Sequence, residues 1–96
     1  MLDSFSMAGL TKSSIHEAAD RLAAVLHALP ADERRDKALY HLQRLLLSVA
    51  ASHSEAVRFA AFTVNKLVAD AGAAWGEAGA AMDRLRAELH AHGHDF

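Results

Sequence analysis

The stretch "VRFAAFTVNKLV", from Val57 to Val68, places apolar residues at intervals of three and four. This period gathers them on one face of an α-helix, because a helical turn contains about 3.6 residues. The predicted core stripe comprises Val57, Ala60, Ala61, Val64, Leu67, Val68 and Ala71. We therefore expect a helix over residues 53–71, closed by Gly72, since glycine readily takes the left-handed conformation that follows a helix.

The same period recurs on both sides of this helix and predicts three more helices, over residues 14–29, 31–51 and 73–92. Their expected core residues are Ile15, Ala18, Ala19, Leu22, Val25, Leu26 and Leu29, then Ala38, Leu39, Leu42, Leu45, Leu46 and Val49, and finally Ala74, Trp75, Ala78, Met82, Leu85 and Leu89. The sequence thus predicts an all-α fold, a small bundle of about four helices. Its domain covers residues 13–92, after an N-terminal arm at 1–12 and before a short tail at 93–96.

Two capping boxes are expected at helix starts. In "SIHE" Ser14 precedes Glu17 by three residues, and in "SHSE" Ser52 precedes Glu55 by the same interval, the spacing at which the two side chains satisfy each other's backbone N–H groups. The second box predicts a break near Ser52. However, the stripes on both sides of it are in phase, so one long kinked helix over residues 31–71 is the alternative.

Glycines weaken the start of the last predicted helix. Gly72, Gly76 and Gly79 lie in or beside it, and each interior glycine costs roughly 1 kcal/mol relative to alanine. Gly76 and Gly79 fall on one flank of the helix. Either another helix approaches closely there, or this segment frays.

Composition excludes several classes of function. The 96 residues include no cysteine, which rules out disulfides and thiolate chemistry, and the net charge is −2. Arg34, Arg35 and Arg44 share a helix with acidic residues rather than forming a basic stripe, so neither nucleic acid nor a membrane is expected as a partner. No basic residue precedes Lys12, so we expect no secretory signal and a cytoplasmic protein. The 22 alanines, with more arginine than lysine, indicate a bacterial or phage genome.

Motifs for metal chemistry are incomplete. "HEAAD" at His16 has the histidine and glutamate of a zinc-protease helix, but Asp20 stands where the second histidine belongs. His90, His92 and His94 in the tail form the other candidate, although Gly93 interrupts the four-residue spacing that would put two imidazoles on one face. We expect a solvated tail, no metal or cofactor and no enzymatic activity. Metal binding or sensing by these histidines is the alternative function.

Two phenylalanines of the helix expected over residues 53–71 lie outside its core stripe. Phe59 and Phe62 fall about 140 to 200° from Val57 on the helical wheel, so they point away from the core. Charged residues, among them Arg58 and Lys66, surround them, as in an association site. On the preceding helix, Tyr40, Leu47 and Arg44 repeat the pattern.

Two explanations remain open for these outward phenylalanines. Either the helix is central in the bundle and its own chain covers it on both sides, for example with the arm through Phe5 and Leu10, or another subunit covers it. We expect association, because each of the other helices has only one narrow apolar stripe to offer, and a two-fold homodimer is the commonest assembly. The predicted function is a protein-protein interaction module, an adaptor, regulator or inhibitor that binds another protein or itself.

Overall fold

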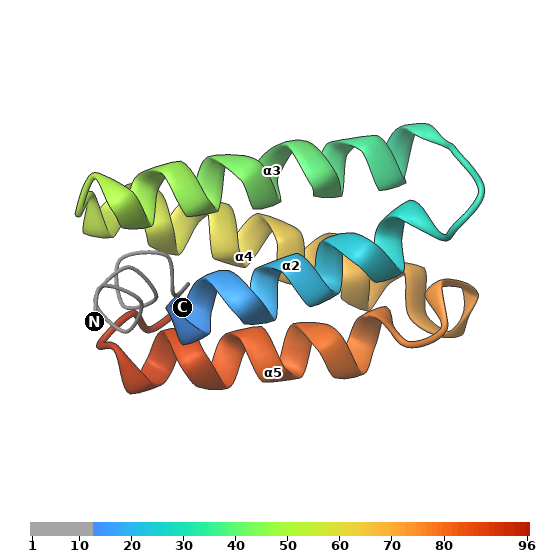
Figure 1. Ribbon diagram of the computed structural model, residues 1–96. Coiled ribbons are helices and arrows are strands. Elements are labelled where there is room, and N and C mark those ends of the chain that lie inside the picture. The colour runs from blue at the N-terminus through green and yellow to red at the C-terminus, as the bar shows by residue number, and fades with distance from the viewer. Residues whose placement is uncertain (1–12) are drawn as a thin grey trace, which may run out of the picture.

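The computed structural model describes residues 13–96, which form four α-helices and one short 3-10 helix with no strand among them (Figure 1). The elements are α2 (Ser14–His27), α3 (Glu33–Ala50), α4 (Ser54–Ala71), η1 (Gly72–Trp75) and α5 (Ala78–Ala91). The predicted all-α bundle is confirmed. The arm expected at residues 1–12 lies outside the described residues.

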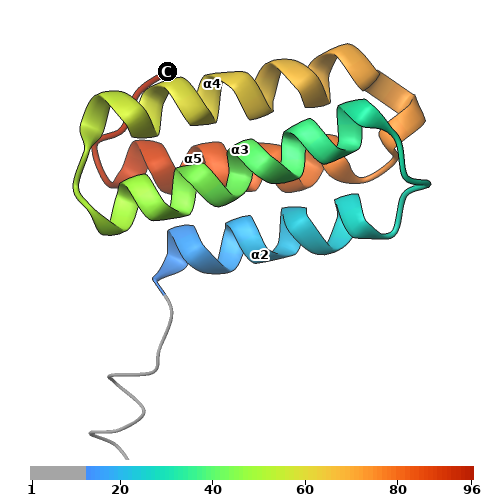
Figure 2. The same ribbon diagram turned by 90° about the horizontal axis from the view of Figure 1, so that it is seen from above.

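The helices pack as two close antiparallel pairs. α3 packs closely on α4 and α2 on α5, whereas the contacts of α2 with α3 and of α4 with α5 are less extensive. α2 and α4 lie at opposite edges of the view in Figure 2, so they sit diagonally across the bundle. One surface of the molecule is therefore formed by the outer faces of α3 and α4 together.

The core is apolar throughout the described residues, with no buried polar or charged side chain. The largest fully buried side chains are Ile15, Leu22, Leu26, Leu42, Leu45, Met82, Leu85, Leu89, Val57 and Val64. All of these belong to the predicted stripes. The last stripe needs one correction: Ala74 is exposed and Ala81 is buried instead, because η1 shifts the phase of the chain before α5 begins. None of the helices in residues 13–96 combines the length and the apolar character that crossing a membrane requires.

Polar caps fix the starts of α2 and α3. The Ser13 hydroxyl accepts a hydrogen bond from the His16 N–H at 3.1 Å, and the Asp32 carboxylate accepts one from the Arg35 N–H at 2.7 Å. The capping box predicted at Ser14 and Glu17 is wrong by one residue. Ser13 takes the extended conformation of a cap, so Ser14 is already inside the helix.

The break between α3 and α4 is confirmed, which excludes one continuous helix, but its mechanism differs from the prediction. Ser52 has a positive φ of 60° and closes α3 as a Schellman motif. Its N–H donates to the Val49 carbonyl at 3.1 Å, and the His53 N–H donates to the Ser48 carbonyl at 3.0 Å. His53, not Ser52, precedes α4, and it makes no side-chain cap. The predicted box of Ser52 with Glu55 is therefore wrong.

The glycine-rich segment delays the last helix. Gly72 and Gly76 both have positive φ, near 55°, and α5 begins only at Ala78 rather than at residue 73. A Cβ atom added at Gly76 or Gly79 would meet nothing within 4 Å. No helix among the described residues uses these glycines for a close approach.

Candidate functional site

Four large apolar side chains are exposed in the part of the chain that the structure describes. Tyr40 and Leu47 on α3 are each 57% exposed, and Phe59 and Phe62 on α4 are 65% and 55% exposed. The outward orientation expected for Phe59 and Phe62 is confirmed. We call these four residues the apolar face. None of its members lies on α2 or α5, so within residues 13–96 the large exposed apolar side chains are confined to one pair of helices.

His41 joins the two helices of the apolar face. Its ring meets the Tyr40 ring edge-on, with centroids 5.1 Å apart, and the Phe59 ring edge-on at 6.3 Å. Beside it runs a groove of about 210 Å³ between α3 and α4, lined by Tyr40, His41, Arg44, Ser48, Ala56, Phe59 and Ala60. The aromatic surfaces of α3 and α4 are therefore continuous. Sequence reasoning missed His41, although its place beside Tyr40 is visible in the sequence.

Charged side chains border the apolar face. Arg44, Arg58 and Lys66 are all exposed, as predicted for its rim. Lys66 Nζ lies 3.6 Å from the Asp70 carboxylate one turn away, and both side chains are more than half exposed. Such solvated pairs contribute little to folding, so these charges are available for contacts with another molecule.

The tail histidines do not converge on one point. His90 Nδ1 lies 3.3 Å from the Asp95 carboxylate, and His92 Nδ1 lies 2.8 Å from the Glu88 carbonyl oxygen. No group of three or more metal-ligating side chains forms within residues 13–96. His94 is held apart, because its N–H donates to the Leu89 carbonyl in the turn that Gly93 makes after α5.

The expectation of a solvated tail is wrong. Phe96 is partly buried against the core, its ring lies 5.9 Å from the His90 ring, and the Arg86 guanidinium lies over it at 5.7 Å. The positive φ of 86° at Gly93 turns the chain back along α5 and makes these contacts possible. Gly93 thus ends the helix, as predicted, but it orders the residues that follow.

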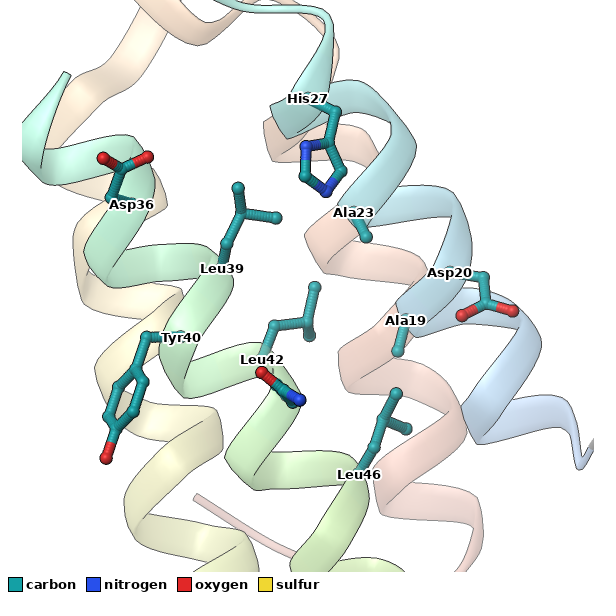
Figure 3. Close-up of a pocket in the computed structure, with 10 residues that line it drawn as sticks. Ala19, Asp20, Ala23, His27, Asp36, Leu39, Tyr40, Leu42 and Leu46 are labelled. Atoms are coloured by element: carbon teal, nitrogen blue, oxygen red, sulfur yellow. The ribbon is translucent and has the colours of Figure 1, made fainter. Parts of the chain in front are cut away.

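A second surface, between α2 and α3, is hollowed rather than raised (Figure 3). This groove measures about 440 Å³, and in it Leu39 and Leu46 of α3 face the short side chains of Ala19 and Ala23 on α2. Asp20, His27 and Asp36 lie at its edge. Sequence reasoning missed the groove, although alanines on one stripe opposite leucines on the next could have indicated it.

Comparison with protein-family models, with curated proteins and with solved structures found no match to this chain. The surface of the molecule is therefore the basis for assigning its function. Two surface features can be compared. The apolar face exposes large side chains, whereas the groove between α2 and α3 is lined mainly by leucines and alanines that are buried or partly buried.

Proposed function

We propose that this chain is a non-enzymatic protein-protein interaction module that binds through its apolar face. The observation that carries the proposal is the distribution of exposed apolar side chains: Tyr40, Leu47, Phe59 and Phe62 all lie on α3 and α4. Single exposed hydrophobic residues are normal on a protein surface. Here four of them lie on two adjoining helices, and the His41 ring meets both Tyr40 and Phe59, so they form the kind of patch that marks an association site.

Energetics favour the same function. Burying a phenylalanine side chain stabilises a complex by roughly 1.5 to 3 kcal/mol, so Phe59 and Phe62 together can form the centre of a small interface. Tyrosine and phenylalanine are enriched at such centres, and Tyr40 lies beside the two phenylalanines. Charged residues at the rim, such as Arg58, would select the partner and its orientation.

The partner is a protein, either another chain or a second copy of this one. A net charge of −2 argues against a polyanionic nucleic acid as the ligand. A bundle of this size that exposes a helical face suits an adaptor, regulator or inhibitor. We place this association in the cytoplasm of a bacterial or phage-infected cell.

The test compares the wild type with the double variant Phe59→Gln and Phe62→Gln. The wild type is expected to form an assembly larger than its 10.3 kDa chain, alone or with an extract of its source cells. The double variant should stay monomeric in both conditions while keeping its helical circular dichroism, because both rings are mostly exposed. Equal sizes for wild type and double variant in both conditions would contradict the proposal.

A matched control is provided by the other pair of helices. Ala24 on α2 and Ala87 on α5 are exposed, so Ala24→Gln and Ala87→Gln add the same polar side chain away from the apolar face. This control should associate like the wild type. If it too is monomeric, the loss in the double variant does not report on the apolar face.

A further inference from the structure

We propose that the occupant of the apolar face is a second copy of this chain, whose α4 packs antiparallel to α4 about a two-fold axis that passes between Phe59 and Phe62. This inference rests on the proposed function and names its partner. Three features carry it: the spacing of the outer residues of α4, the charges at the two ends of that row, and the position of Tyr40 and Leu47 on α3.

The outer residues of α4 follow the spacing of a coiled-coil seam. Glu55, Phe59, Phe62 and Lys66 are separated by four, three and four residues, which is the interval of alternating seam positions in a heptad. All four side chains are exposed. The inner stripe of α4 packs in the bundle, so this helix carries one seam for its own chain and, on the opposite side, a second seam that residues 13–96 leave largely exposed.

Two-fold symmetry makes this outer seam complementary to itself. Glu55 precedes Phe59 by four residues and Lys66 follows Phe62 by four. The midpoint between Glu55 and Lys66 is therefore also the midpoint between Phe59 and Phe62. In an antiparallel pair centred there, Phe59 meets the partner's Phe62, and Glu55 meets the partner's Lys66. A parallel pair would instead set glutamate against glutamate and lysine against lysine, so the charges select the antiparallel arrangement.

The interactions within one chain leave these charges available. The Glu55 side chain makes no hydrogen bond or ion pair with the described residues. Lys66 contacts Asp70 at 3.6 Å, but that pair is solvent-exposed and can exchange for a contact with the partner's Glu55.

The apolar residues of α3 have the same centre of symmetry. The turn at Ser52 joins α3 to the antiparallel α4, so residues at similar distances from it along the two helices lie at similar heights in the bundle, and Arg44, Ser48, Ala56 and Ala60 line the groove between them. The midpoint between Tyr40 and Leu47 is as far from Ser52 as the midpoint between Phe59 and Phe62. The axis that pairs the phenylalanines therefore also brings Tyr40 level with the partner's Leu47.

Disulfide trapping tests this register, because the chain contains no cysteine. Glu55 and Lys66 lie eleven residues apart on α4, about 16 Å at 1.5 Å per residue, whereas a disulfide needs Cα atoms within about 7 Å. The Glu55→Cys chain and the Lys66→Cys chain, given different tags, should therefore cross-link to each other when mixed and oxidised. Neither should cross-link to itself. Adding Phe59→Gln and Phe62→Gln to both chains should abolish the cross-link.

Two outcomes overturn the inference and leave the proposed function standing. Cross-linking of each chain to itself, and not to the other, would show a parallel seam. A wild type that stays monomeric alone, but forms a larger assembly through Phe59 and Phe62 in cell extract, would show that the partner is a different protein. The proposed function fails only if wild type and the double glutamine variant have the same size in both conditions.

Discussion

The ring of Phe59 on α4 meets the ring of His41 on α3 edge-on, with centroids 6.3 Å apart. The contact lies at the outer surface, where the Phe59 side chain is 65% exposed. Because His41 also touches Tyr40, the apolar side chains of two helices form one surface rather than separate spots. A continuous apolar surface of this kind is what a partner helix or helix pair can cover.

Replacing Ser52 should reveal the strain at the end of α3. Ser52 has a φ of 60°, a left-handed conformation that costs a residue with a side chain roughly 1 to 2 kcal/mol and that glycine adopts readily. We expect Ser52→Gly to raise the free energy of unfolding by about 1 kcal/mol. Ser52→Ala should change it little, because the serine side chain makes no cap hydrogen bond. Urea denaturation of both variants measures the difference.

Gly93 provides the opposite control, since it occupies the same position after α5 with a φ of 86°. There the Gly93 N–H donates to the His90 carbonyl and the His94 N–H to that of Leu89, as in the turn at Ser52. Gly93→Ala should lower the free energy of unfolding by about 1 kcal/mol. Equal effects of alanine and glycine at Ser52 would show that its backbone is not strained.

The N-terminal cap of α3 is the second test of the fold. The Asp32 carboxylate accepts a hydrogen bond from the Arg35 N–H at 2.7 Å. Asp32→Ala should lower the free energy of unfolding by about 1 kcal/mol, because that donor loses its partner. Asp32→Asn should be nearly neutral, since asparagine caps helices about as well as aspartate. Thermal denaturation compares the two variants. If Asp32→Asn lost as much stability as Asp32→Ala, the charge of Asp32, and not its capping hydrogen bond, would be what stabilises α3.

The helices and their buried faces could be predicted from the sequence, because the spacing of apolar residues encodes them. The stripes of Leu22, Leu42, Val64 and Leu85 are buried where the three- and four-residue spacing places them, because packing inside the bundle removes an apolar helical face from water. The helix ends were less predictable. Ser13 and Ser14 are chemically equal candidates for a cap, and only the backbone conformation distinguishes them.

Part of the candidate site could likewise be predicted from the sequence, and part of it could not. The outward position of Phe59 and Phe62 follows from the helical period alone, so it could be predicted. The contact of His41 with Phe59 depends on how α3 and α4 are aligned, which the Ser52 turn sets and no period encodes. The ordered tail could not be predicted either, because the packing of Phe96 against the core depends on where the Gly93 turn directs it.

The tail should contribute measurable stability. Phe96 is partly buried against the core, lies beneath the Arg86 guanidinium and meets the His90 ring edge-on, so Phe96→Ala should lower the free energy of unfolding by about 1 kcal/mol. Asp95 is the matched control, because its side chain is 82% exposed. Asp95→Ala should change stability by less than about 0.5 kcal/mol. A neutral Phe96→Ala would show that the tail is solvated after all.

Arg44 should weaken self-association. It lies on α3 near the level of the proposed two-fold axis, so it approaches the partner's Arg44, and two like charges repel there. We expect Arg44→Gln to tighten the dimer several-fold, an effect that is larger at low salt. Dilution of a fluorescently labelled chain measures the dissociation constant. Weaker association of Arg44→Gln would place Arg44 among the favourable contacts and move the axis away from it.

Sedimentation equilibrium of the wild type, alone and over a dilution series, tests the central claim most directly. We predict a mass that rises with concentration from 10.3 kDa toward twice that value and no further, because a two-fold pair leaves no copy of the apolar face exposed. The Phe59→Gln and Phe62→Gln double variant should remain at 10.3 kDa throughout. A double variant that dimerises like the wild type would contradict the account, since Phe59 and Phe62 would then lie outside the interface.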